Sequence, residues 1–197
     1  MTAALTPKGA ATRARLLDAA ARELADDGGL ELATVAARVG VAPSVPYRYF
    51  GSKDGLVAAV VDGFYDEYEA AVFNASDVPG GTWLEREQLR IDREIAFFYA
   101  HPLGRAVAGG LLHEAAATRA DAERLRAHTV QAARNIRAGQ RAGELDRGVD
   151  ADLAAAAIMG AIRSTLAQAL SRRRPPPARR VAELAHRLGA AALRGDG

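Results

Sequence analysis

The chain contains no cysteine, which excludes disulfide frameworks and cysteine-ligated zinc or iron–sulfur centres. It also lacks long apolar runs. The longest uncharged stretches, 95–104 and 153–162, span ten residues each, whereas a membrane-spanning helix needs about 20. Residues 1–8 contain no apolar run of the length of a secretion signal. These absences predict a cytoplasmic protein without a membrane partner.

Residues that favour β-sheets are scarce. The 197 residues include 46 alanines and 20 leucines against 13 valines and five isoleucines, a balance that favours helices. The length fits one or two domains with a core of their own. We therefore expect an all-α protein of about nine helices.

The chain also has no large excess of either positive or negative charge. The net charge is only +2, and residues 1–55 carry seven Lys and Arg against six Asp and Glu. Basic residues dominate only in residues 171–197, where seven Arg face two acidic residues. Charge alone therefore does not predict a nucleic-acid partner.

Glycine, proline and capping residues divide the helical pattern. We expect a flexible N-terminal arm over residues 1–11, a first domain over 12–61 and a second over 62–197, with the boundary inside the helix that Ser52 caps. In the first domain, helices are predicted from about residue 12 to 27, over 32–39 and over 43–50. Gly28-Gly29 ends the first helix and Gly40 ends the second.

The two short helices around Gly40 have the size of a helix-turn-helix, whose second helix presents an exposed face to a DNA major groove. Pro46 and Phe50 lie four residues apart and should face the core. The residues that remain available to the DNA groove are Ser44, Val45, Tyr47 and Arg48. A valine methyl group can contact a thymine methyl group, and arginine can bind a guanine edge or a phosphate.

Residues 35–56, VAARVGVAPSVPYRYFGSKDGL, resemble the DNA-binding signature of the tetracycline-repressor (TetR-like) family of bacterial transcription regulators. The most specific part is Tyr-x-x-Phe-x-Ser-Lys-x-x-Leu, which begins at Tyr47, and TRARLLDAA at 12–20 extends the likeness to about residues 12–61. The resemblance implies phosphate contacts from Tyr47, Tyr49 and Lys53. It also implies a homodimer that binds a palindromic operator in double-stranded DNA and responds to a small-molecule effector, most often as a repressor.

Two departures from the family pattern bear on DNA binding. Pro46 stands where the family has an aliphatic residue, so the second helix of the motif should be short or distorted at its start. Glu31, Leu32 and Ala33 replace a small hydroxyl cap and a basic or polar phosphate partner. We expect an operator complex that is weaker or that relies on Lys8 and Arg13.

The segment from residue 150 to 192 suggests a dimer interface. Small residues share one face of the penultimate predicted helix, and the last helix carries an apolar stripe, so two chains can form a four-helix interface. The predicted interface residues are Leu153, Ala157, Gly160, Ser164, Ala167, Leu184 and Leu188. Alternatively, the small residues only make room for helices of the same chain.

The middle helices should enclose an effector pocket, mostly apolar with a few polar groups. The candidate lining residues are Trp83, Phe97, Phe98, His101, Leu111, His113, Met159 and Arg163. No two histidines have the i, i+3 or i+4 spacing of metal ligands on one helix, so we expect neither a metal site nor another cofactor.

Two other functions compete with a ligand-responsive regulator. An enzyme would need a nucleophile with a base, a metal cluster or a phosphate loop, and the sequence contains no HExxH, GxxxxGK[ST], GxSxG or GxGxxG motif, so no catalytic residue is predicted. A helical small-molecule-binding or assembly protein with weak or lost DNA binding remains the alternative, because residues 31–33 depart from the DNA-binding pattern.

Overall fold

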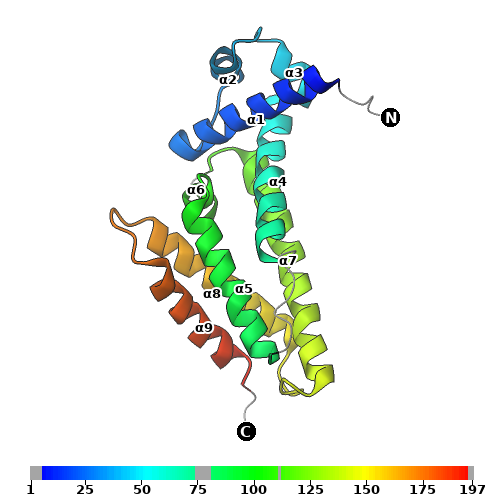
Figure 1. Cartoon of the computed structure of the whole chain (residues 1–197), viewed down its shortest axis with the longest axis vertical. Coiled ribbons are helices and arrows are strands. Elements are labelled where there is room, and N and C mark those ends of the chain that lie inside the picture. The colour runs from blue at the N-terminus through cyan, green and yellow to red at the C-terminus, as the bar shows by residue number, and fades with distance from the viewer. Residues whose placement is uncertain (1–5, 74–80, 111, 195–197) are drawn as a thin grey trace.

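The computed structural model describes residues 6–73, 81–110 and 112–194, and every regular element in these ranges is an α-helix (Figure 1). The helices are α1 Pro7–Asp27, α2 Leu32–Val39, α3 Val45–Phe50, α4 Lys53–Val72, α5 Trp83–Ala100, α6 Gly104–Gly109, α7 Ala115–Ala142, α8 Ala151–Leu170 and α9 Ala178–Ala192. The all-α fold expected from the composition is confirmed.

Helix α1 begins earlier than the sequence pattern predicts. The Thr6 side chain accepts a hydrogen bond from the Gly9 N–H at 3.2 Å, and Pro7 occupies the first turn, where its missing N–H has no helical partner to lose. Residues 7–11 are therefore helical and not part of a flexible arm. Residues 1–5 lie outside the described part of the chain.

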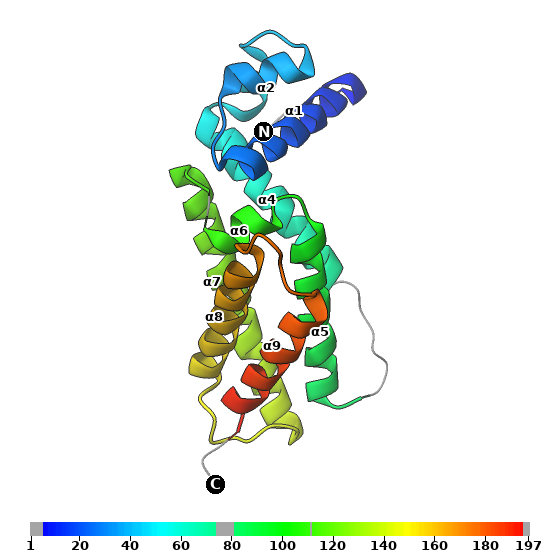
Figure 2. The same cartoon turned by 90° about the vertical axis from the view of Figure 1, so that its left-hand side faces the viewer.

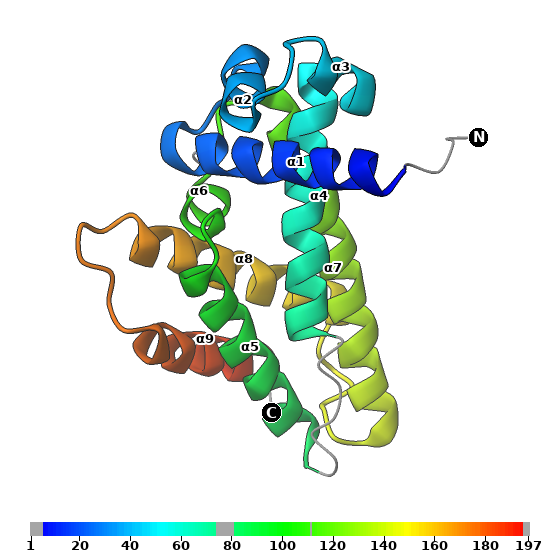
Figure 3. The ribbon, with the colours of Figure 1, turned by 45° about the horizontal axis from the view of Figure 1, so that its top comes forward.

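Helices α1 to α3 form a small unit at one end of the molecule, and α4 runs from this unit into the larger bundle (Figures 1 and 3). Ser52 caps α4 by accepting the Gly55 N–H at 3.0 Å. Helix α4 packs against α1 and α3 on one side and against α5 and α7 on the other. One continuous helix thus joins the motif that resembles a DNA reader to the rest of the chain.

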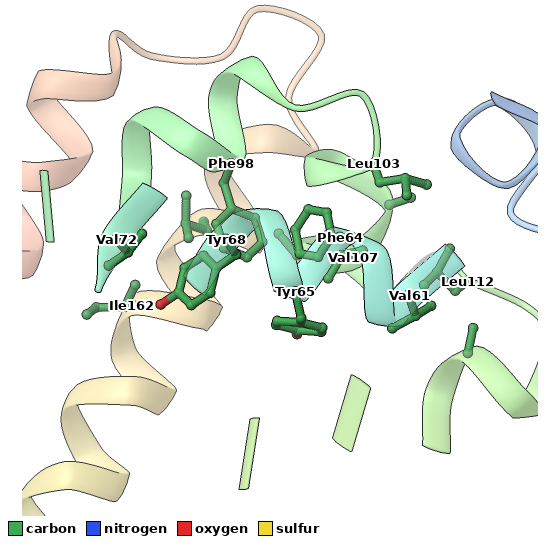
Figure 4. Packing of buried hydrophobic residues seen from close by; sticks show 14 of the residues in the cluster. Val61, Phe64, Tyr65, Tyr68, Val72, Phe98, Leu103, Val107, Leu112 and Ile162 are labelled. Carbon is green, nitrogen blue, oxygen red and sulfur yellow. The ribbon is translucent and has the colours of Figure 1, made fainter. Parts of the chain in front are cut away.

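Aromatic side chains of α4 fill the centre of the bundle (Figure 4). Phe64 and Tyr68 are buried there against Phe98 of α5, with ring centroids 5.4 Å and 6.0 Å from that of Phe98. Edge-to-face packing of this kind stabilises beyond the area it buries. The far half of α4 is therefore held rigidly against α5.

Helices α8 and α9 lie side by side and complete the bundle (Figure 2). Among the described helices, α8 alone is long and apolar enough to cross a membrane by length and composition. In the structure its apolar side chains pack against α6, α7 and α9, among them Ile162 and Leu166, which are almost fully buried. One face of α8 thus belongs to the core of the bundle.

Candidate functional site

Helices α2 and α3 meet at a tight turn that starts at Gly40, whose φ of +72° suits glycine. The turn leaves one face of α3 open to solvent. Ser44 and Arg48 are exposed, and Tyr47 is 55% exposed, which is unusual for a large aromatic residue. Val45 and Tyr49 are half-buried. The residues predicted to read DNA therefore lie together on or beside an accessible face of α3.

Helix α3 starts at Val45, two residues later than predicted. Pro46 occupies its first turn and is buried, as its spacing from Phe50 predicts, whereas Phe50 is only half-buried. Proline is tolerated there because the first N–H groups of a helix have no intrahelical acceptor. Pro46, which stands where the family has an aliphatic residue, thus lies in a short helix of six residues.

The junction of α3 and α4 depends on a glycine. A Cβ atom added to Gly55 would collide with the backbone carbonyl of Phe50. This close approach fixes the recognition helix against the start of α4. Gly55 therefore sets the position of the surface formed by Ser44, Tyr47 and Arg48.

Lys53, the expected phosphate anchor, already has anionic partners. Its Nζ lies 3.1 Å from Oε1 of Glu31 and 3.0 Å from Oε1 of Glu114. The hydrogen bond with Glu114 is the main cause that raises the pKa of Lys53 above its usual value. Glu114 Oε1 also accepts the Leu30 N–H at 3.3 Å. A phosphate at Lys53 would compete with these two carboxylates for the ammonium group.

The start of α2 is capped by another helix. Glu31, at the N-cap position, makes no side-chain cap bond, but its N–H donates to the buried Glu23 of α1 at 3.3 Å. Arg38 pairs with the same Glu23 at 3.2 Å. Lys8 and Arg13 are the residues on which we expect DNA binding to rely in place of a phosphate partner at the start of α2. Lys8 is exposed, and the Arg13 guanidinium lies 5.2 Å from the Phe50 ring centroid.

A cavity of about 250 Å³ lies within the bundle between α4, α5, α7 and α8. Aliphatic and aromatic side chains make up most of its wall, with several polar groups among them. Its lining residues are Tyr68, Val72, Phe73, Trp83, Glu87, Arg90, Ile91, Glu94, His128, Gln131, Ala132, Asn135, Ile136, Ala155, Ile158, Met159 and Ile162. This is the composition of a site for a small, mainly hydrophobic ligand.

The polar groups of the cavity form two clusters. Glu87 pairs with Arg90 one turn along α5 and accepts the Asn135 amide at 3.0 Å. Glu94 accepts a hydrogen bond from the Tyr68 hydroxyl, and burial raises the pKa of Glu94 to about 7. Burial also raises the pKa of Tyr68 well above its usual value, so its hydroxyl remains a donor.

Only Trp83 and Met159 of the predicted pocket residues line this cavity. Phe97, Phe98 and His101 pack instead around Phe64, and the His101 ring stacks on Phe97. His113 is exposed, and its backbone N–H donates to the Gly28 carbonyl at 2.6 Å. Leu111 lies outside the described residues. Aromatic character alone did not distinguish core residues from cavity-lining residues.

Arg163 also lies outside the cavity wall, in a polar network that joins four helices. It donates to the Tyr65 hydroxyl of α4 at 3.1 Å, the Val107 carbonyl of α6 at 2.6 Å and Asp121 of α7 at 2.7 Å. Tyr65 donates to the same carboxylate. The network is half-buried, so its loss would leave poorly solvated polar groups.

A sequence signal for the cavity does exist in α5. Trp83, Glu87, Arg90, Ile91 and Glu94 recur at helical spacing, which places three charged residues on the same face as two apolar ones. Charges on an inward-facing helix stripe indicate a polar site inside the protein. Of this stripe only Trp83 was among the predicted pocket residues, and Glu87, Arg90, Ile91 and Glu94 were not.

The predicted interface residues of α8 and α9 lie on the surface of the single chain. Leu153 is 70% exposed, and Leu184 and Leu188 are 38% and 40% exposed. Ala157, Gly160 and Ser164 are exposed as well, and Ala167 is half-buried. Within the described residues, no atom from another part of the chain lies within 4 Å of a Cβ built on Gly160. The small side chains therefore do not make room for the chain's own helices at this position.

Comparison with known proteins agrees with this architecture. Residues 16–60 match the family model of bacterial regulatory proteins, tetR family. No curated protein matches the chain. Solved structures with the same fold include a TetR transcription regulator from Haloarcula marismortui, with a TM-score of 0.77 at 16% identity over 94% of this chain and 100% of that one. A TetR-like regulator from a Rhodococcus species has a TM-score of 0.68 at 21% identity, over 98% and 100% of the two chains.

A third similar structure is the transcriptional regulator FadR from Bacillus subtilis in complex with stearoyl-CoA, with a TM-score of 0.72 at 19% identity over 93% of this chain and 99% of that one. At these low sequence identities, the structural similarity of the whole chain shows only that the fold is shared. Together, the family match and the shared fold confirm the resemblance predicted from the sequence. The chain has the N-terminal domain and the architecture of a TetR-family transcriptional regulator.

Proposed function

We propose that the protein is a cytoplasmic, homodimeric transcription regulator that binds a palindromic operator and is released from it by a small molecule, without catalytic activity. The observation that carries this proposal is the accessible face of α3, where Ser44, Tyr47 and Arg48 project from a motif that Gly55 locks onto α4. In this proposal Arg48 and Val45 contact base edges, and Tyr47, Tyr49 and Lys53 contact phosphates.

The exposed face of α8 and α9 supports the homodimer. Leu153, Leu184 and Leu188 offer apolar area next to the small residues around Gly160, where a second helix can approach closely. A two-fold axis through this face would pair two copies of α3. Two copies of α3 read successive major grooves when they are about 34–36 Å apart.

The cavity supports regulation by a small molecule. It lies between α4 and α7, and both helices extend from it toward α1–α3. The B. subtilis regulator FadR binds stearoyl-CoA within the same fold. A ligand weakens DNA binding only if it binds more tightly to the arrangement of α3 helices that does not fit the operator.

Selection of bound sequences from a library of random DNA duplexes tests this proposal. We expect an inverted repeat with half-sites about one helical turn apart. The Arg48→Ala variant should select an altered or less defined half-site. Failure of the wild-type protein to enrich any sequence would contradict the proposal.

One observation favours a second function, a helical ligand-binding or assembly protein with weak DNA affinity. Lys53 is held by Glu31 and Glu114, so part of the phosphate-binding charge is neutralised within the chain. This function predicts ligand binding without a selectable DNA sequence. The same duplex selection therefore separates the two candidates.

A further inference from the structure

The cavity contains more negative charge than its apolar walls would suggest. Two carboxylates from α5, Glu87 and Glu94, face it within one helical stripe. The charge of Glu87 is balanced by Arg90, and the Asn135 amide adds a hydrogen bond. Glu94 has a different environment, because the group that hydrogen-bonds to it is the uncharged Tyr68 hydroxyl. One ionised Glu94 thus gives the cavity a net negative charge.

Among the residues that the structure describes, the charged groups around the cavity that face Glu94 are engaged with other partners. Tyr68 comes from α4, Glu87 and Arg90 from α5, His128 from α7 and Arg163 from α8. Arg90 is engaged with Glu87, Arg163 with Asp121, and His128 with Glu69 at 3.0 Å. A half-buried carboxylate on the wall of an apolar cavity is stabilised by a cation that enters from outside the chain.

The remaining wall suits a hydrophobic body. Trp83, Ile91 and Ile158 are buried beside the cavity, and Phe73 and Met159 contribute an aromatic ring and a flexible thioether. The volume of about 250 Å³ is below the roughly 300–1,000 Å³ typical of sites for drug-sized ligands. The occupant is therefore small, with one compact apolar part.

We propose that this cavity binds a small hydrophobic amine in its protonated form, with the ammonium group bonded to the Glu94 carboxylate and the Tyr68 hydroxyl and the apolar part against Trp83 and Ile158. The proposal rests on the proposed function, in which this cavity is the effector site. It also excludes a ligand like stearoyl-CoA, because the cavity is too small for it and its phosphates would be repelled by Glu94.

Fluorescence of Trp83, the single tryptophan of the chain, reports on occupancy of the cavity without DNA. Three probes of matched shape separate the ligand classes: 4-phenylbutylamine, 4-phenylbutanol and 4-phenylbutyrate. At pH 8 we expect the amine to bind at least about tenfold more tightly than the alcohol, with the carboxylate weakest. Equal or tighter binding of the alcohol or the carboxylate, or no binding of any probe, would overturn the proposal.

The pH dependence provides a second test that needs no variant. The amine is protonated at both pH 6 and pH 8, whereas a Glu94 carboxyl with a pKa of about 7 is mostly neutral at pH 6 and mostly ionised at pH 8. Amine affinity should therefore rise about tenfold from pH 6 to pH 8. Alcohol affinity should stay the same. A flat profile for the amine would contradict the assigned role of Glu94.

Glu94→Gln removes the charge but keeps the shape of the side chain. We expect it to weaken amine binding at least about tenfold at pH 8, to abolish the pH dependence and to leave alcohol binding within about twofold. Glu123→Gln, an exposed change of the same kind on α7, is the matched control. Unchanged amine binding in Glu94→Gln would overturn the proposal. Selection of DNA by the wild-type protein is measured separately, so failure of the amine proposal and failure of the regulator function are distinguishable.

Discussion

At the scale of single residues, the proposed DNA binding requires Lys53 to exchange partners. Lys53 is bound to Glu31 and Glu114, and only Glu114 belongs to the bundle that holds the cavity. A DNA phosphate would compete for the same ammonium group. Because surface ion pairs contribute little in water, the exchange is possible at a small free-energy cost.

Lys53→Ala should weaken binding to all DNA sequences and reduce the salt dependence of affinity. Each phosphate contact contributes about one unit to the slope of log affinity against log salt concentration. We therefore expect a slope about one unit smaller for each subunit contact. Titrations at several salt concentrations measure it, with Arg48→Ala as the comparison that should also change base preference. An unchanged slope would show that Lys53 does not contact a phosphate.

Glu114→Gln should strengthen DNA binding. The amide keeps an oxygen for the Leu30 N–H but loses the negative charge that holds Lys53. We expect affinity to increase about threefold at low salt and the gain to shrink as salt rises, because the Lys53–Glu114 ion pair is only half-buried. Glu123→Gln controls for the loss of one negative charge elsewhere on α7. If the Glu114→Gln variant bound DNA with wild-type affinity, Glu114 would not compete with a DNA phosphate for Lys53.

At the scale of elements, several ion pairs join α4 to α7. Arg124 of α7 pairs with Asp62, Asp66 and Glu69 of α4 at 2.9–3.2 Å, and Arg119 pairs with Asp54 at 3.3 Å. The residue His113, just before α7, donates its backbone N–H to the Gly28 carbonyl between α1 and α2, and the middle of α7 lines the cavity. In the proposed function, a ligand that displaces one of these helices would therefore also move the other, and with them α3.

Tyr65→Phe should reveal this coupling. The change keeps the buried ring but removes the hydroxyl that donates to Asp121 and accepts from Arg163. We expect a loss of about 1–3 kcal/mol in the free energy of unfolding, because two polar groups lose a partner. The ligand-dependent change in operator affinity should fall more than either affinity alone, as paired binding isotherms would show. Full retention of the coupling would mean that the network does not transmit the signal.

Local features such as helix bounds could be predicted from the sequence, whereas contacts between residues far apart in the chain could not. Leu32–Val39 was predicted with its observed bounds, because local periodicity and the terminal Gly40 define it. The partners of Lys53 could not be predicted, because Glu114 is distant in sequence and reaches Lys53 only through tertiary packing. A pocket among the middle helices was predicted, but of the predicted lining residues only Trp83 and Met159 lie on the observed wall, because that wall combines residues from four helices.

At the scale of the whole molecule, the proposed function requires a second copy of the chain. A single α3 is one short helix and reads one half-site, whereas the proposed operator has two. The exposed face of α8 and α9 is where the second copy is expected. Its centre at Gly160 has open space in the single chain, so a larger side chain there should affect association more than folding.

Gly160→Arg should therefore produce a folded monomer. Arginine favours the interior of a helix by up to about 1 kcal/mol over glycine, but its charge and bulk would separate two closely packed α8 helices. We expect sedimentation to show a monomer at micromolar concentration, with operator affinity reduced at least about tenfold. Ala122→Arg on the exposed surface of α7 should leave both properties unchanged. A dimeric Gly160→Arg protein would place the interface elsewhere.

The mass of the complex with one selected duplex tests the central claim most directly. Sedimentation of the wild-type protein with a duplex that carries the selected inverted repeat should give two chains per duplex. A footprint of the same complex should protect two equal half-sites about one helical turn apart. A single chain on the duplex, or a footprint without two-fold symmetry, would contradict a regulator that reads its operator as a dimer.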